Sequence, residues 1–347
     1  MLYADILPKN GNLLNFDDTS IVAGSVSVTM STCRQNMFDF GTFNAAVLKM
    51  SVIDDDALDH EFSGASVMLR ESDEQEQSVY LGTYYIDGTT VKRVRNTVTF
   101  SAYDRAVKFD IEISDNIRST SYTALTAIQA ACSAAGNTVL YNADLNDFPN
   151  ISVTFTLENA ALQTWRDVVM WCCQLCAANA IIDRMGRLKI IHARWQHEGT
   201  EDHVINAEQR ISVQFSDARI YPKYMTAYSG TAVKEYVSGY TPEGDQAVQS
   251  QPGTLQLDSN PLLAGKDDTE CDTVNRAIIG NIQSFTQRQI TAKLFQNGDI
   301  GLGDAVRFLG GNVDVRRSIL GMVTYIVWKY HGATTVTCTA PKPAEVE

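Results

Sequence analysis

The chain has 347 residues, of which 44% are hydrophobic and 20% are charged, a composition typical of a globular protein with two or three domains. Its 28 basic and 41 acidic residues give a formal net charge of −13. Non-specific nucleic-acid binding depends on cationic contacts with phosphates, so this charge argues against a protein that grips a duplex. It does not argue against a protein past which nucleic acid slides without adhering.

Apolar runs and cysteines indicate the compartment. The longest strongly apolar run, residues 319–328, is about half the length that a membrane-spanning helix needs. The first residues, MLYADILPKN, lack the basic and apolar regions of a secretory signal, so we expect none. The cysteines number 7 and show no framework spacing, which argues against a disulfide scaffold and favours a reducing compartment.

The first region, up to about residue 112, has the pattern of β-strands. Segments 20–28, 45–53 and 64–70 are rich in Val, Ile and Ala and are separated by Gly, Asp and Asn. In 97–103, Val98, Phe100 and Ala102 alternate with polar residues, the pattern of a half-buried strand.

An acidic run in this region invites comparison with a calcium loop. Asp54, Asp55 and Asp56, followed by Asp59, lack the glycine and the closing glutamate of an EF-hand at the required offsets. We interpret the run as a solvated turn between strands.

The pattern changes to a helical one from residue 113. A first helix is predicted from apolar residues at three- to four-residue spacing, and Gly136 is well placed to end it. Its spaced residues are Tyr122, Leu125, Ile128 or Gln129, and Cys132. A second helix is predicted over about 157–178, and 179–191 has the pattern of strand, glycine turn, strand. The stripe of the second helix consists of Leu162, Trp165, Val169, Cys172 and Cys176. We therefore expect a small α/β unit over 113–207.

Strands return after residue 208. They are predicted at 210–215 and 223–237, and a loop rich in Gly, Pro and Gln is predicted over 238–254. A third helix follows, with Asp268 or Thr269 as the expected N-cap. One face of that helix would carry Cys271, Val274, Ile278, Ile282 and Phe285. Residues 290–340 are again rich in strand patterns.

Two segments far apart in the chain resemble each other. NTVTFSA (96–102) ends the first strand-rich region, and TTVTCTA (334–340) ends the last. Each follows a long hairpin-like stretch, LGTYYIDGTTVKRVR in one case and LGMVTYIVWKYHGA in the other. Alternating Thr and Val also arise independently in strands, but the match suggests two related β domains.

The cysteine cluster at 172–176 has three interpretations: core packing, a metal site or a redox pair. Cys172 and Cys176 share the apolar stripe of the second helix, where free cysteine behaves as a small hydrophobe. Cys173 lies about four turns into the predicted helix, too far from its N-terminus for a lowered thiol pKa. A structural zinc site needs four ligands, and the spacing of His192, His197 and His203 matches no zinc pattern. We favour packing over adventitious metal binding and over redox chemistry.

Other catalytic signatures are absent. HEGTEDH (197–203) has too many residues between its histidines for a helical HExxH motif, and GLGD (301–304) is more typical of a hairpin than of a nucleotide loop. The chain has no Walker-type motif and no GxSxG elbow. A pair of carboxylates for glycosidase chemistry is set by fold geometry, and nothing in the sequence singles one out. We therefore name no catalytic, cofactor-binding or metal-binding residue and expect no cofactor.

A series of segments along the chain has a recognisable order and spacing: NFDDTSIVAGSVSV (15–28), FDFGTFNAAVLKM (38–50), LGTYYID (81–87), TVTFSAYDRAVKFD (97–110), TWRDVVMWCCQLCAANAIIDRMGRLKI (164–190), SNPLL (259–263) and LGDAVRF (302–308). In this order the segments resemble the baseplate hub proteins of tailed phages and related contractile injection particles. The Ala-Tyr-Asp-Arg run at 102–105 is the most telling. Order and spacing together carry this resemblance.

The resemblance implies a mainly β fold with α+β parts: two similar antiparallel β-barrel tube domains, an α/β domain and a helical insert. We assign the first barrel to 1–112, the α/β domain to 113–207, the second barrel to 208–240 and 289–347, and a loop and helical insert to 241–288. It also implies a homotrimeric, non-enzymatic ring in the virion tail baseplate, assembled in the bacterial host cytoplasm. Its partners would be tail tube or distal tail ring proteins, a spike or tail-lysin protein and the tape-measure protein. DNA would pass through without specific binding, and no membrane partner is implied.

Two other classes stay open from the residues alone. A tail-tip receptor- or carbohydrate-binding protein would also be acidic and rich in strands, and its 4 Trp and 14 Tyr do not decide the question. An enzyme that uses the Cys and His groups would carry stoichiometric zinc or a thiol of low pKa.

Overall fold

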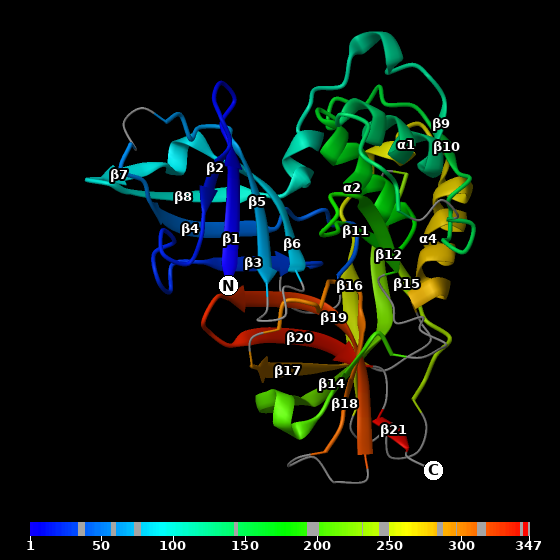
Figure 1. Ribbon diagram of the computed structural model, residues 1–347. Helices are drawn as coiled ribbons and strands as arrows, with labels where there is room; N and C mark the ends of the chain where they lie inside the picture. The colour runs from blue at the N-terminus through cyan, green and yellow to red at the C-terminus, as the bar shows by residue number, and fades with distance from the viewer. Residues whose placement is uncertain are drawn as a thin grey trace.

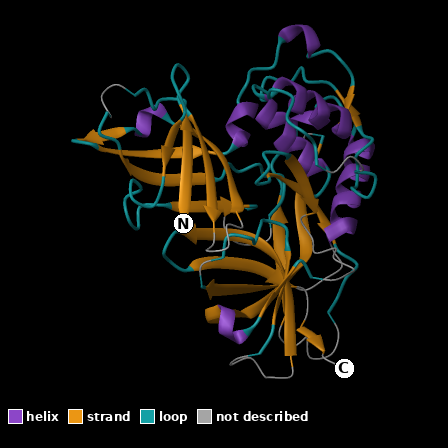
Figure 2. Ribbon diagram, viewed as in Figure 1, coloured by secondary structure: helices purple, strands orange, loops and turns teal. Residues whose placement is uncertain are grey.

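The computed structural model describes the chain except for residues 34–38, 57–59, 73–77, 142–144, 193–200, 231, 243–249, 283–286, 296, 311–316, 341–342 and 346–347. Most of the described elements are β-strands in large antiparallel sheets, and the α-helices lie together on one side of the molecule (Figure 2). The mainly β class predicted from the sequence is confirmed. Among the described residues, no helix has both the length and the apolar character needed to cross a membrane.

The first β unit comprises strands β1 to β8 (Figure 1). Its strands are β1 (Leu2–Leu7), β2 (Leu14–Phe16), β3 (Ser27–Ser31), β4 (Val47–Ile53), β5 (Ser66–Ser72), β6 (Ser78–Ile86), β7 (Lys92–Val94) and β8 (Thr97–Tyr103). Antiparallel pairing joins them in the order β2–β1–β5–β6–β8–β4–β3, and β7 pairs with β8. The predicted alternation in β8 is confirmed, because Val98, Phe100 and Ala102 are at most 1% exposed.

One predicted strand is much shorter than expected. The segment 20–28 was predicted as a strand throughout, but β3 begins only at Ser27. The preceding residues turn, because Gly24 has φ 70° and Ser25 N–H donates to Val22 O at 3.1 Å. Ile21 makes only an isolated bridge to Val52 of β4. The apolar segment 20–28 therefore includes a turn before the strand begins. Gly24 permits this turn, because glycine adopts positive φ readily.

The α/β unit follows β8. It contains helices α1 (Ala124–Ala134) and α2 (Trp165–Leu175), the short strands β9 (Tyr122–Thr123) and β10 (Thr154–Phe155), the hairpin β11 (Ala178–Ile182) and β12 (Leu188–His192), and 3₁₀ turns at Arg105–Phe109 and Asp115–Ile117. Thr164 and Asp167 form a reciprocal capping box at the start of α2. The predicted end of the first helix is confirmed, because Gly136 follows α1 with φ 72°. The predicted hairpin is confirmed as well, with its turn at Gly186.

The second β unit is formed by strands on both sides of an insert. Its strands are β13 (His203–Ile205), β14 (Arg210–Ser229), β17 (Gln287–Leu294), β18 (Ala305–Phe308), β19 (Arg317–Lys329), β20 (Thr334–Ala340) and β21 (Pro343–Glu345), with a 3₁₀ turn at Ala207–Gln209. The insert contains β15 (Ala232–Val237), β16 (Ser250–Gln256), a 3₁₀ turn at Pro261–Leu263 and α4 (Asp268–Ile282).

The insert differs from the sequence prediction in two respects. The predicted loop over 238–254 contains the start of β16, which pairs in parallel with the second half of β14. The predicted N-caps of the third helix, Asp268 and Thr269, are also wrong. Asp267 caps α4, because its Oδ1 accepts the Glu270 N–H at 2.8 Å and Glu270 accepts the Asp267 N–H in return.

The same pairing order occurs twice in the chain. In the first unit it is β3–β4–β8–β6–β5, and in the second it is β14–β17–β20–β19–β18. All of these pairs are antiparallel, and the strands of each series follow one another in the same sequence order. The similar segments at 96–102 and 334–340 fall on β8 and β20, which hold the same place in the two series.

Neither series closes into an unbroken ladder in the described part of the chain. β2 pairs with β1, and the residues after it reach β4 only at the bridge between Ile21 and Val52. In the second unit, β13 pairs with β18 and is joined to β14 through the chain but not through a ladder. Two closed barrels therefore stay a prediction, as do the domain boundaries assigned above.

The buried side chains form two clusters. One cluster joins both β units, and it includes Met50 and Phe100 from the first unit and Ile290 and Val336 from the second. The other joins the α/β unit to the insert, including Cys172 of α2 and Ile278 of α4. The insert thus packs with the α/β unit, while the two β units share one core.

Candidate functional site at the junction of the two β units

Strand β3 connects the two β units. Residues Ser27–Thr29 pair with Val47–Lys49 of β4, and Ser27–Ser31 pair with Tyr325–Lys329 of β19 on the other edge. The two strands lie side by side at the centre of the molecule (Figure 1). Backbone hydrogen bonds therefore run from one β unit into the other without interruption, which fixes the position of each unit relative to the other.

The side chain of Asp18, an exposed residue, adds a second connection. Asp18 Oδ1 accepts hydrogen bonds from the Tyr330 hydroxyl at 2.7 Å and from the Leu2 N–H at 2.8 Å. Burial, and then the hydrogen bond to Asp18, raises the pKa of the Tyr330 hydroxyl, which therefore remains protonated as a donor. The contact joins the residue after β19 to the first strand of the other unit.

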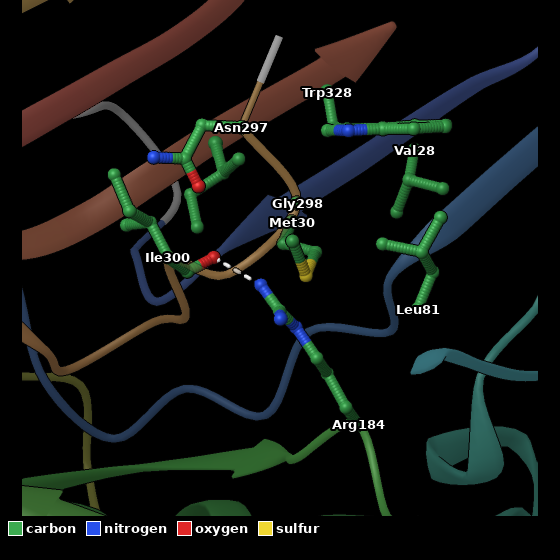
Figure 3. Close-up of a pocket in the computed structure, with 9 residues that line it drawn as sticks. Val28, Met30, Leu81, Arg184, Asn297, Gly298, Ile300 and Trp328 are labelled. Atoms are coloured by element: carbon green, nitrogen blue, oxygen red, sulfur yellow. Dashed lines mark hydrogen bonds between the residues drawn. The ribbon is translucent and has the colours of Figure 1, made fainter. Parts of the chain in front are cut away.

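A small cavity lies beside this junction (Figure 3). It is lined by Val28, Met30, Leu81, Arg184, Asn297, Gly298, Ile300, Ile326 and Trp328. The space is sufficient for about one water molecule. A cavity of this size cannot hold a substrate, so the junction is a packing feature and not a pocket for chemistry.

Polar groups at the cavity connect the α/β unit to the junction. Arg184, in the turn between β11 and β12, donates to Ile300 O at 2.6 Å (Figure 3). Burial lowers the pKa of Arg184, and Asp304 and Asp299 oppose this effect. Trp328 Nε1 is buried without a hydrogen-bond partner among the described residues. The cavity and this donor are consistent with a bridging water.

Asp104 fixes the path from the first β unit into the α/β unit. It follows β8 directly, and its carboxylate accepts the Ala106 N–H and the Ala46 N–H, each at 2.9 Å. Burial raises the pKa of Asp104 to about 7, against the lowering effect of these two hydrogen bonds. Both oxygens are used by backbone donors, so Asp104 is a structural cap.

The cysteines considered as a metal or redox site are buried. Cys172 and Cys173 are 0% exposed and Cys176 is 2% exposed, and all are free thiols. Burial raises the pKa of Cys176 to about 12 and raises the pKa of the other two well above that of a free thiol. Thiols with a raised pKa are poor nucleophiles and poor metal ligands, which supports the packing interpretation.

Cys173, which is not one of the residues of the predicted apolar stripe, is buried as well. Helix α2 contacts α1 on one side and β11 and the turn at Pro261–Leu263 on others, so several faces of it are covered. The helix also begins at Trp165, which places Cys173 about two turns from its N-terminus instead of four.

The histidines considered as zinc ligands lie apart from the cysteines. The His192 ring stacks on Phe148 at 3.9 Å between centroids. His203 Nε2 lies 3.1 Å from Asp304 Oδ2, and this hydrogen bond raises the pKa of His203. His197 lies outside the described residues. In the described part of the chain, no three or more His, Cys, Asp or Glu residues are grouped so as to hold a metal ion.

A polar cluster that no sequence motif predicts attaches helix α4 of the insert to β14 and β15. Asp272 of α4 accepts hydrogen bonds from Tyr236 OH at 2.7 Å, Ser229 Oγ at 2.9 Å and Lys234 Nζ at 3.2 Å. These donors, Tyr236 first, lower the pKa of Asp272 to about 2. Its partners are 36 to 43 residues away in sequence, so no local motif marks them.

No family model and no curated protein sequence matches the chain. Its structure is similar to those of phage tail proteins. The 43 kDa tail protein of prophage MuSo2 from Shewanella oneidensis matches with a TM-score of 0.55 at 12% identity, over 100% of both chains. A tail protein from Neisseria meningitidis MC58 matches with 0.55 at 10% identity, over 98% of this chain and 96% of that one. Prophage tail protein gp18 from Listeria monocytogenes EGD-e matches with 0.53 at 11% identity, over 97% and 94%.

At these identities the likeness concerns the fold. The chain has the fold of phage tail proteins over almost its whole length, and the resemblance inferred from scattered sequence segments is confirmed at that level.

Proposed function

We propose that this protein is a structural baseplate hub at the tip of a phage tail or of a phage-derived particle. Three copies form a pseudo-six-fold ring that joins the six-fold tail tube to the three-fold spike and encloses a channel for DNA or the tape-measure protein. The single observation that carries the proposal is the pairing order found twice in one chain. Three chains with two similar units each present six similar units while retaining three-fold symmetry.

The partners follow from this position. Tail tube or distal tail ring proteins would contact the six similar units, and a spike or tail-lysin protein would contact the three-fold side. The proposed location is the virion tail baseplate, assembled in the host cytoplasm. The proposed role is structural and involves no catalysis.

Charge supports a channel that does not retain DNA. Three chains carry a formal charge of 3 × −13 = −39, which disfavours steady adhesion of a polyanion. We expect no duplex binding near physiological salt in a gel-shift assay. A sub-micromolar, salt-sensitive shift would contradict this part of the proposal.

The deciding experiment is the mass of the purified protein in solution. Sedimentation equilibrium should give three times the 38.3 kDa of the chain, and class averages of negatively stained particles should show a ring with six lobes. A protein that stays monomeric at high concentration would refute the hub. If such a monomer bound glycans, with affinity lost on changing aromatic residues, the receptor-binding alternative would replace it.

A further inference from the structure

Strand β7 of the first β unit is equivalent to the part of β19 in the second unit that pairs with β3. In the first unit, Val94 of β7 pairs with Thr97 of β8. In the second unit, Val327 of β19 pairs with Thr335 of β20, and Thr97 and Thr335 are the same residue of the similar segments 96–102 and 334–340. β7 therefore corresponds to the second half of β19, in the same register.

The two positions differ in what covers them. Val327 is half-buried because its other edge pairs with Thr29 of β3, at the junction of the two units. Val94 is 70% exposed, and all described pairings of β7 are with β8. Arg93 is engaged within its own unit, where it donates to His60 O at 3.0 Å. An exposed strand edge is ready to pair with another chain.

The corresponding receiving edge lies in the second unit. β14 holds the place of β3, and its edge opposite β17 is occupied by β16 of the insert. In the described part of the chain β16 pairs only with β14, and the side chains of Gln251, Thr254 and Gln256 on it are exposed. β16 is thus the outermost strand at the edge equivalent to the one that β3 presents to β19.

We infer that β7 of one copy pairs with the outer edge of β16 of the next copy, so that β16 connects β14 to the neighbouring chain where, within each chain, β3 pairs with β19 directly. The inference rests on the proposed ring. β7 lies at the far end of the first unit from β16, so the two edges of one chain do not meet (Figure 1). A contact between two different surfaces of identical chains is head-to-tail, and such contacts generate closed rings when the rotation permits.

Charge does not oppose pairing between β7 and β16. β7 and the residue after it supply Lys92, Arg93 and Arg95, in a chain whose net charge is −13. β16 carries no charged residue, and the exposed Asp258 follows it. The basic strand therefore meets no like charge. The alternative is that Lys92 serves only to prevent edge pairing, which is a common use of lysine on an edge strand.

Cysteine cross-linking tests the contact directly. All 7 native cysteines are buried, so exposed thiols introduced at Val94→Cys and Thr254→Cys are the ones that react with a short bismaleimide. We expect the double variant to form covalent dimers and trimers and nothing larger. The matched pair Val94→Cys with Thr273→Cys, which places the second thiol on the exposed face of α4, should form none.

A charge substitution tests the same contact without a linker. Val94→Glu would place a carboxylate in the contact, and we expect assembly to require at least about tenfold more protein. Met68→Glu is the control, because Met68 is 45% exposed on β5 of the same unit. Circular dichroism of both variants checks that they fold.

The outcomes separate the two proposals. If the unmodified protein is a trimer but the Cys pair does not cross-link, or Val94→Glu assembles like Met68→Glu, the strand assignment is overturned and the hub stands. A monomeric unmodified protein would overturn both.

Discussion

In the first β unit, β1 runs antiparallel to β5, whereas in the second unit β13 runs parallel to β18. The central strands differ much less, because Val98 and Phe100 of β8 and Val336 and Cys338 of β20 are all buried at corresponding positions. The edges differ most: β3 is covered by the other unit, while its counterpart β14 is covered by the insert. The two similar frameworks thus share buried central strands and differ where they meet their neighbours.

The largest expected effect on the free energy of unfolding comes from helix α2, which belongs to the α/β unit and to neither β unit. Cys172→Asp would place a charge among the buried residues of α2, and we expect a loss of about 3 kcal/mol or more in the free energy of unfolding. Urea unfolding followed by tryptophan fluorescence measures it, with Cys172→Ser as the milder control.

Cys173→Ser should leave assembly intact, and stoichiometric zinc in the purified protein would contradict the packing role of these thiols.

Two equivalent buried positions carry side chains of different size, so truncating each one tests the comparison of the two β units. Phe100 and Cys338 hold the same place in β8 and β20 and are at most 1% exposed. Phe100→Ala should cost about 3–5 kcal/mol, and Cys338→Ala only about 1 kcal/mol, because the smaller side chain leaves the smaller cavity. Denaturant unfolding of the two variants gives the difference. Equal losses would show that the two sites are not equally buried in solution.

The junction itself should contribute less than a large core residue. Asp18→Ala leaves the Tyr330 hydroxyl and the Leu2 N–H without their acceptor, and we expect a loss of about 1–3 kcal/mol. Asp115→Ala is the matched control, because the Asp115 side chain is 100% exposed and its ion pair with Arg118 should matter little. A junction variant as stable as this control would mean that β3–β19 pairing alone joins the units.

The smallest expected effect depends on pH and belongs to the second unit alone. The hydrogen bond to Asp304 raises the pKa of His203 above its usual 6.5, so protonated His203 stabilises the fold. This contribution is complete below pH 6.5 and is lost as pH rises through the raised value. We expect less than about 1 kcal/mol, because the group is partly exposed. His203→Gln should remove this part of the pH dependence between about pH 6 and 9 in thermal unfolding, and an unchanged profile would exclude His203 as its source.

Local patterns in the sequence predicted several elements to within a few residues. The alternation in 97–103 gave β8, because a strand with one buried face must alternate. Spacing and Gly136 gave the end of α1, because only a residue that tolerates positive φ follows a helix in this way. By contrast, the sequence predicts a loop at the start of β16, because the hydrogen bonds of this strand are made with β14 and its own polar residues give no strand pattern.

The candidate site was less predictable than the fold. Asp18 and Tyr330 are 312 residues apart, and no local pattern marks either as a partner of the other. Asp104 appeared in the Ala-Tyr-Asp-Arg run that carried the family resemblance, but its role as a double backbone acceptor required the position of Ala46. The burial of Cys173 required the elements that pack around α2.

By itself, then, the sequence determined elements with a strong local pattern, such as β8 and the end of α1, and it showed that one strand motif occurs twice, because these properties depend on neighbours within a few residues. Only the tertiary structure decided which edges are paired. Hydrogen-bond donors and acceptors of the backbone are the same in every residue, so a strand carries no local signal for its partner. Val94 and Val327 show the result: the same residue type in equivalent strands is 70% exposed in one unit and half-buried against Thr29 in the other.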